Sequence, residues 1–325
     1  MNRPRVLLIG PVPGLSRALK RRKVPFVVWS DTAVTVRGAE EVLVEPYATG
    51  AQSVESVVQP LLEDGWFTHV IAGRPVAEMT AARARRVAGA RAAESAAILR
   101  YGGGEAWVDA LADRGLPVAE PGDAVSCSVE SFVQDGGDRF HSLVEWREDG
   151  VLQGVPAAMA EASRESVLDL HRRVIELSSI SWGTLHLEVH LEGGVASLIS
   201  AALCPPESGI VELLSLAYDF DAWNAALAVE MDEAFEVPSE PRVRACAWLL
   251  RGPIGAVIGA EGADSLDSIP GVASVRLVVR DGIVVPGGPT PGMLGHVLFQ
   301  ASSRESLEVA VDAARRTLVL SNQGE

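Results

Sequence analysis

Lysine is nearly absent from this sequence of 325 residues. Only Lys20 and Lys23 occur, so no lysine after residue 23 is available to bind a phosphate group. Acidic residues outnumber basic residues by 43 to 28, which gives a formal net charge of −15. Such a charge argues against nucleic acid or an anionic membrane surface as the main partner.

Cysteine is scarce, and long uninterrupted apolar runs are missing. Three cysteines without CxxC spacing cannot all pair, so we expect reduced thiols and a cytoplasmic protein. The longest apolar run, residues 245–260, is interrupted by Arg251 and Pro253. A membrane-spanning helix is therefore not expected.

Hydrophobic residues make up 48% of the sequence, which is enough for a sizeable core. Residues 1–90 alternate between short apolar strands and helical stretches, with strands expected at 5–9, 25–29, 41–44 and 69–72. Continuous apolar strands separated by helices predict a parallel α/β domain covered on both faces. Residues 91–120 read as a helical connector broken at Gly102-Gly103-Gly104.

Beyond residue 120 the pattern changes to longer strands joined by turns. We expect strands at 126–133, 140–146, 184–191 and 195–203, and helices at 167–177, 210–216 and 222–231. Residues 121–240 form a core unit in this division, and residues 241–325 form a small β-rich unit. Its closing helix is expected to start with a capping box made by Ser302 and Glu305.

Two segments carry a family resemblance. Glu130-Ser131-Phe132-Val133, followed by the turn 135–138 and the strand 140–145, resembles a hinge strand and hairpin. Gly183-Thr184-Leu185-His186-Leu187-Glu188 resembles a strand that carries a metal-binding acid. With the order of parts, these segments resemble the ATP-grasp superfamily, especially its carboxylate–amine ligases.

The resemblance implies an α/β fold with an α+β core. It consists of an N-terminal pre-ATP-grasp-like parallel domain, a truncated ATP-grasp-like core and a C-terminal small β-rich unit. It also implies ATP and Mg²⁺ as cofactors. Glu188 would be the metal ligand, with His186 and Glu207 beside it as catalytic residues, and Glu130 would contact the cofactor. For Glu207 the alternative is a carboxylate that interacts with a helix N-terminus.

The departures from the family pattern are substantial. Members carry a second acid, an asparagine and an arginine on the strand paired with the Glu188 strand, and these positions fall on Ser200, Ala202 and Cys204. A serine is a poor magnesium ligand and an alanine is none. The interval between Pro117 and Ser126 is also too short for the family's glycine-rich lid subdomain, so most of that subdomain is expected to be deleted.

Two residue patterns leave alternatives open. His186, Glu188 and His190 alternate along a strand and share a face, so they could hold a transition metal or form a partly polar sheet surface. Cys204 could be a nucleophile with His186 or His190 as its base, or a buried inert thiol.

Two functions follow from these expectations. The first is a divergent ligase that joins a small carboxylate, such as an amino acid, to an amine through an acyl phosphate. The second is a catalytically inactive pseudoenzyme that needs no cofactor and binds a small molecule or a partner, either a second copy or an intact ligase. If the alignment is right, Glu188 and Ser200 lie on adjacent strands and face one cleft.

Overall fold

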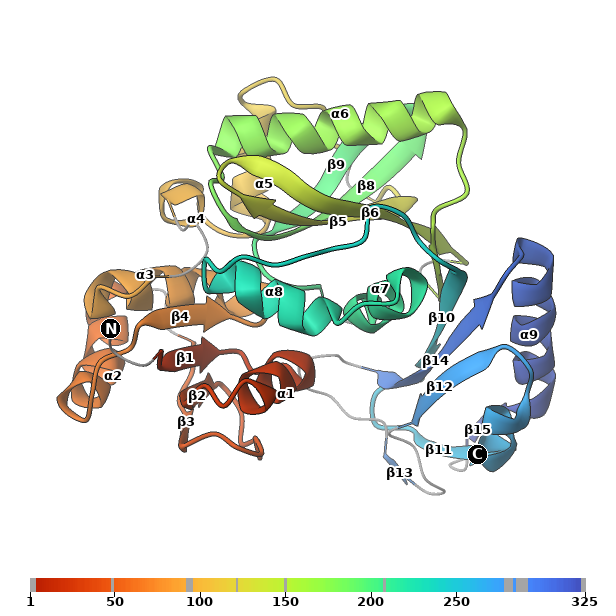
Figure 1. The fold of residues 1–325 in the computed structure, drawn as a ribbon, viewed down its shortest axis with the longest axis horizontal. Helices are drawn as coiled ribbons and strands as arrows, with labels where there is room; N and C mark the ends of the chain where they lie inside the picture. The colour runs from red at the N-terminus through yellow and green to blue at the C-terminus, as the bar shows by residue number, and fades with distance from the viewer. Residues whose placement is uncertain are drawn as a thin grey trace.

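The computed structural model describes residues 4–47, 50–91, 96–120, 122–148, 151–206, 209–277, 283–284 and 292–322. Within these ranges the strands form sheets of four, eight and three strands. Figure 1 shows the sheet of β1 to β4 at the lower left, strands β5, β6, β8 and β9 of the largest sheet above it, and β10, β12 and β14 of that largest sheet at the right beside the C-terminal elements. The mixed α/β class predicted from the sequence is confirmed.

The N-terminal sheet is parallel, with the order β3-β2-β1-β4. Its strands are β1 (Val6–Ile9), β2 (Phe26–Ser30), β3 (Glu41–Val44) and β4 (His69–Ala72). Its helices are α1 (Pro13–Arg21), α2 (Ala51–Glu63), the 3-10 turn η1 (Pro75–Ala77) and α3 (Glu78–Ala88). All four residues of β1 are fully buried, because α1 packs on one face of the sheet and α2 and α3 pack on the other.

The large sheet has the order β12-β14-β10-β7-β6-β5-β8-β9, and its paired strands are antiparallel. The strands are β5 (Cys127–Gln134), β6 (Gly137–Arg147), β7 (Leu152–Val155), β8 (Gly183–Glu192), β9 (Val195–Ala202), β10 (Arg244–Arg251), β12 (Val272–Leu277) and β14 (Met293–Ala301). The expected strands between residues 126 and 203 are all found. β7 was not expected from the sequence, because a four-residue strand containing a glycine and a glutamine carries little periodic signal.

Helices cover both faces of this sheet. They are α4 (Ala96–Tyr101), α5 (Glu105–Ala112), α6 (Glu161–Ser178), α7 (Ile210–Tyr218) and α8 (Ala222–Glu230). In Figure 1, α6 lies above the sheet, whereas α7 and α8 lie below it. Alternation along β8 therefore sends Leu185, Leu187 and Val189 into the core that α5 and α6 cover. His186 and Glu188 point to the opposite face.

The C-terminal elements continue the large sheet. The remaining elements are β11 (Val257–Glu261), η2 (Ala263–Ser268), β13 (Ile283–Val284), α9 (Arg304–Thr317) and β15 (Val319–Asn322). Because β10 pairs with both β7 and β14, the sheet runs without interruption across the proposed boundary at residue 241. The division into four units stays a prediction.

The expected cap of the last helix was placed one residue too early. Helix α9 begins at Arg304, so Ser303 is its N-cap, and the Ser303 hydroxyl accepts a hydrogen bond from the Ser306 backbone amide at 3.1 Å. Ser302 lies outside the helix, because a cap must directly precede the first helical residue.

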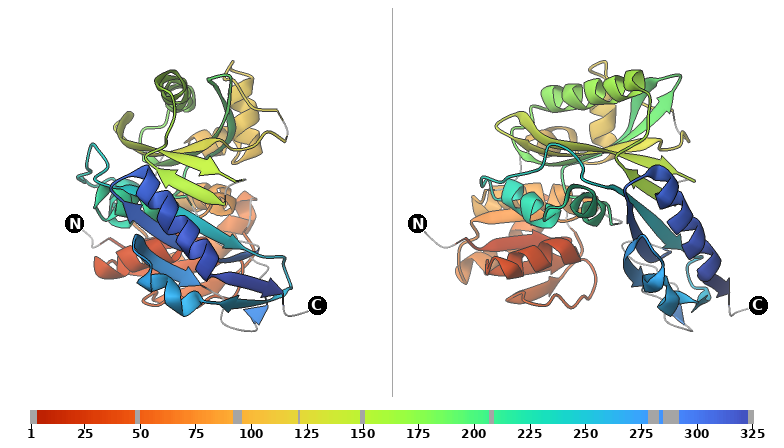
Figure 2. Two further views of the ribbon diagram at one scale, coloured as in Figure 1. Left: turned by 90° about the vertical axis from the view of Figure 1, so that its right-hand side faces the viewer. Right: turned by 45° about the vertical axis from the view of Figure 1, so that its right-hand side comes forward.

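The N-terminal sheet is joined to the core through α1 and α8. A Cβ atom on Gly14 would lie 1.9 Å from the Trp223 ring, so only glycine permits this close approach of the two helices. Arg21 on α1 also forms an ion pair with Asp221, the N-cap of α8, at 2.6 Å. Figure 2 shows the two helices side by side from a second direction. Among the described helices, none is long and apolar enough to cross a membrane.

Candidate functional site

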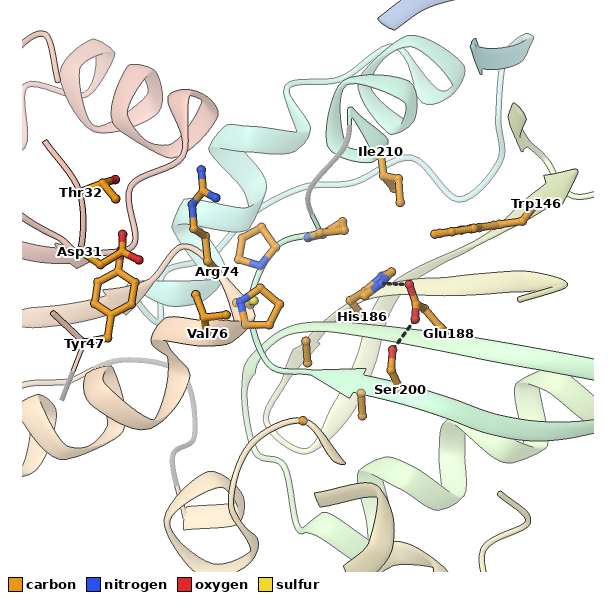
Figure 3. Close-up of a pocket in the computed structure, with 17 residues that line it drawn as sticks. Asp31, Thr32, Tyr47, Arg74, Val76, Trp146, His186, Glu188, Ser200 and Ile210 are labelled. Carbon is orange, nitrogen blue, oxygen red and sulfur yellow. Dashed lines mark hydrogen bonds and ion pairs between the residues drawn. The ribbon is translucent and has the colours of Figure 1, made fainter. Parts of the chain in front are cut away.

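A cavity of about 750 Å³ lies between the N-terminal sheet, the large sheet and the start of α7. We call it the main cavity. Figure 3 shows that Asp31, Thr32 and Tyr47 lie at its N-terminal end, whereas Trp146, His186, Glu188 and Ser200 lie at the other end. Its volume falls within the range of pockets that bind small molecules.

The N-terminal end of the cavity is built at the carboxyl ends of parallel strands. Asp31 follows β2 directly, and Arg74 follows β4 after a single glycine. That glycine, Gly73, approaches the preceding turn so closely that a Cβ atom on it would lie 2.2 Å from the Gly10 carbonyl oxygen. The carboxyl edge of an open parallel sheet is where such folds usually bind ligands.

Glu188 and Ser200 meet across adjacent strands at the other end. They are directly paired in the ladder between β8 and β9, and the Ser200 hydroxyl donates a 2.7 Å hydrogen bond to Glu188 Oε2. Both side chains line the main cavity. The prediction that they occupy adjacent strands and face one cleft is confirmed.

His186 lies between two acidic side chains. Its Nδ1 donates to the Glu130 carboxyl group, with both oxygens at 2.9 Å, and its Nε2 is 3.7 Å from Glu188 Oε1. Ser128 donates a 2.7 Å hydrogen bond to the same Glu130, and Trp146 Nε1 donates to Ser128 Oγ at 3.0 Å. We call this connected set the His186 network.

The His186 network fixes the charges at this end of the cavity. Burial has the largest single effect and lowers the pKa of His186, but the contacts with Glu130 and Glu188 together outweigh it and raise this pKa to about 10. Burial raises the pKa of the Glu188 carboxyl, because it disfavours the ionised form. The contacts with His186 and the Ser200 hydroxyl have the opposite effect and hold this pKa below its usual value. At neutral pH a protonated His186 therefore stands beside an ionised Glu188.

Glu130 does not line the main cavity. It is 2% exposed, and its carboxyl group is directed at His186. Its predicted contact with a cofactor would have to pass through His186, so that role stays a prediction. His190 is also directed elsewhere: its ring contacts the Ala124 carbonyl at 2.9 Å, and Asp123 lies 4.0 Å away.

Cys204 and Glu78 lie at the wall where β9 ends. Cys204 is buried and contributes to the cavity lining. Burial raises the pKa of the neighbouring Glu78 to about 8, although the Leu203 amide donates a hydrogen bond to its carboxyl group. The alternatives of a nucleophilic or an inert Cys204 both stay open. Glu207 lies outside the described residues.

The lining residues offer few of the groups that a magnesium nucleotide needs. Glu188 and Asp31 are the acidic residues among the described residues of the lining, and Figure 3 places them at opposite ends. Among the described lining residues Arg74 is the only lysine or arginine, and Glu207, which follows the lining residue Pro206, lies outside the described part of the chain. Magnesium requires several oxygen ligands around one point, so the described lining residues do not by themselves fit ATP and Mg²⁺.

A metal centre built from protein side chains alone is not found either. Among the described residues, no group of three or more histidine, cysteine, aspartate and glutamate side chains is arranged to hold a metal ion. His186 and Glu188 share a face as predicted, but His190 does not line the cavity with them. Glu188 as a metal ligand stays a prediction.

Sequence reasoning missed the whole N-terminal end of the cavity. Asp31, Tyr47 and Arg74 were not proposed as site residues, nor was Trp146 at the opposite end. A signal for two of them was present, because polar residues that directly follow parallel strands mark the binding edge of such sheets. Trp146 carried no signal, since an aromatic residue in a strand usually belongs to the core.

The interval between α5 and β5 holds little regular structure. Between the end of α5 and the start of β5, the described residues contain a single bridge, Val118 to Leu198, and no longer strand or helix. The expected deletion of the lid subdomain stays a prediction.

Comparison with known proteins places this geometry in context. No family model matches the sequence. The uncharacterized protein y4rH of Sinorhizobium fredii (strain NBRC 101917 / NGR234) is 25% identical over 163 residues, which are 49% of this chain and 34% of that protein. The match thus spans about a third of the curated relative's length.

Solved structures give a broader match. The L-amino acid ligase from Bacillus licheniformis superposes with a TM-score of 0.83 at 14% identity, and the match covers 100% of both chains. Phosphoribosylglycinamide synthetase from Anaerococcus prevotii gives 0.80 at 10% identity, covering 99% of this chain and 100% of that one. N5-carboxyaminoimidazole ribonucleotide synthetase from Thermotoga maritima superposes with a TM-score of 0.73 at 13% identity. That match covers 98% of this chain and 100% of that one. At these identities the likeness concerns the fold.

Proposed function

We propose that this chain, which has the ATP-grasp fold, binds a small amine-bearing molecule in the main cavity and is not an ATP-dependent ligase. This is the pseudoenzyme alternative raised by the sequence. One observation carries it: the acid that would hold a metal, Glu188, already has a protonated imidazole and a serine hydroxyl as neighbours.

The physical argument concerns charge. A triphosphate and its magnesium ion need cations and oxygen ligands around the phosphates. At the Glu188 end of the cavity the fixed cation is His186, and its Nδ1 is committed to Glu130. The paired strand contributes Ser200 and Ala202, which add one hydroxyl group.

The class of ligand follows from the lining. Ser200 donates to Glu188 Oε2, whereas Glu188 Oε1 is 3.7 Å from His186 and can accept a hydrogen bond from a ligand ammonium or N–H group. Trp146, Val76 and Ile210 favour apolar atoms. An amine with an apolar body, such as an amino acid amide, matches both requirements. We expect the protein to use this ligand in binding or regulation, alone or with a protein partner.

The experiment has two parts. Calorimetry with ATP and Mg²⁺ should detect no binding at micromolar concentrations. Thermal-shift screening of amines with apolar bodies should find ligands that stabilise the wild type and not Glu188→Gln, which has nearly the same shape. Glu192→Gln on the exposed end of β8 is the matched control and should behave like the wild type.

The ligase remains the second candidate, because the fold matches an L-amino acid ligase over the whole chain. Micromolar, magnesium-dependent ATP binding, with phosphate release that requires a carboxylate and an amine, would establish it and overturn the first proposal. Loss of amine stabilisation in Glu192→Gln to the same extent as in Glu188→Gln would also count against the proposed site.

A further inference from the structure

A second cavity, of about 330 Å³, adjoins the main cavity at the start of α1. We call it the arginine pocket, because Arg17, Arg37 and Arg74 line it. Its lining, as far as the chain is described, also includes the hydroxyl-bearing residues Ser16 and Thr35 and no acidic residue. Three guanidinium groups around one cavity are notable in a chain with a net charge of −15.

The charge around Arg17 is not balanced by nearby carboxylates. Glu212 Oε1 lies 3.5 Å from Arg17 and 3.1 Å from Arg276, so one carboxylate serves two arginines. Burial lowers the pKa of Arg17, and repulsion from Arg276 lowers it further. Arginine stays charged in proteins, so this crowding leaves positive charge that an anion would neutralise.

The backbone at the start of α1 adds to the same field. The N-cap, Val12, provides no side-chain hydrogen bond, and the first turn of α1 contains no acidic residue. Pro13, the first helical residue, has no N–H, so the first turn offers the backbone amides of Gly14 and Leu15. Amides at a helix N-terminus favour an anion, which reinforces what the arginines already select.

The two cavities share a wall. Arg74 lines both, and its Nε donates to the Pro11 carbonyl at 3.4 Å, which holds the side chain against the turn before α1. A ligand with an anionic group in the arginine pocket can therefore extend past Arg74 into the main cavity.

We propose that the arginine pocket binds the phosphate group of a phosphate monoester. A phosphate has three terminal oxygens and up to two charges, which suits guanidinium groups that approach from several elements. A carboxylate has two oxygens and one charge and would satisfy fewer of them. Only the expectation that the rest of the ester enters the main cavity rests on the proposed function.

The test uses inorganic phosphate and ribose 5-phosphate as probes in calorimetry at low ionic strength. We expect both to bind the wild-type protein, and acetate not to bind. Arg17→Gln and Arg37→Gln should each weaken binding of both probes by about tenfold or more, because a hydrogen bond to a charged group is lost. Arg21→Gln is the matched control, since Arg21 is on the same helix and pairs with Asp221 outside the pocket.

Each outcome decides the matter. Absence of phosphate binding to the wild type, or an equal loss in Arg21→Gln, would overturn the pocket. Binding of inorganic phosphate without ribose 5-phosphate would overturn the monoester class. Glu188→Gln should bind phosphate like the wild type. Failure of amine binding with intact phosphate binding would thus reject the proposed function alone, and the reverse result would reject this inference alone.

Discussion

The charge state of His186 makes the stability of this protein depend on pH in a defined direction. With a pKa of about 10 in the folded chain, His186 keeps its proton far above the pH at which the unfolded chain releases it. A raised folded pKa contributes stability that is fully present below the unfolded pKa. That contribution is lost as the pH rises toward the folded value.

The magnitude can be worked out between pH 6 and pH 8. An unfolded histidine has a pKa of about 6.5, and each unit of difference corresponds to about 1.4 kcal/mol, so the wild type should lose about 2 kcal/mol from this residue over that range. This figure needs only a folded pKa above 8, which is a weaker requirement than the value of about 10. Burial opposes this rise in pKa, and the Glu130 carboxyl, 2.9 Å from Nδ1, and Glu188 together produce it.

Urea unfolding at several pH values measures this effect. The free energy of unfolding should fall more steeply with pH in the wild type than in His186→Gln, and the difference between the slopes isolates His186 from other titrating groups. His186→Gln should also be less stable at pH 6, because Glu130 loses its partner. Parallel slopes in the two proteins, or an NMR titration of His186 with a midpoint below 7, would refute the reasoning.

Two further predictions concern neighbouring polar contacts. Glu78 has a pKa of about 8 in the folded chain, so the protein loses stability as the pH rises from the pKa of Glu78 in the unfolded chain to 8. Glu78→Gln should flatten the dependence of the free energy of unfolding on pH over that range, as measured by urea unfolding. An unchanged dependence would show that Glu78 is ionised in the folded chain. Ser200→Ala removes the 2.7 Å hydrogen bond to Glu188 and should cost about 1 kcal/mol in thermal unfolding. It should also raise the pKa of Glu188 in an NMR titration, and an unaltered titration would contradict the contact.

Local pattern was enough for most elements of the fold. The apolar run of β1 and the turn chemistry before β6 depend on adjacent residues, so the sequence predicts them directly. The pairing of β10 with β7 joins residues far apart in the chain, and no local pattern encodes it. For the same reason, the sequence did not reveal that the large sheet crosses residue 241.

The candidate site was predictable in part. A hairpin with a short turn was enough to place Glu188 and Ser200 on neighbouring strands. Their direct pairing depends on a register shift between Glu188 and Val189, because the register of the turn alone would set Glu188 opposite Ile199. The partnership of His186 with Glu130 depends on β8 lying beside β5, and residues 56 positions apart meet there only after folding. The N-terminal end of the cavity requires a second unit to dock, which pattern analysis of single segments does not address.

The continuity of the large sheet limits how this protein can be cut or recombined. β10 lies between β7 and β14, so removing the chain after residue 240 would strip β7 of the partner on one side and expose its backbone hydrogen-bonding groups. The N-terminal sheet is different, since its described strands pair with one another and, in an isolated bridge, with Arg91, while α1 meets the core through side chains. Exchange of parts between related chains is thus tolerable just after residue 91 and disruptive near residue 240.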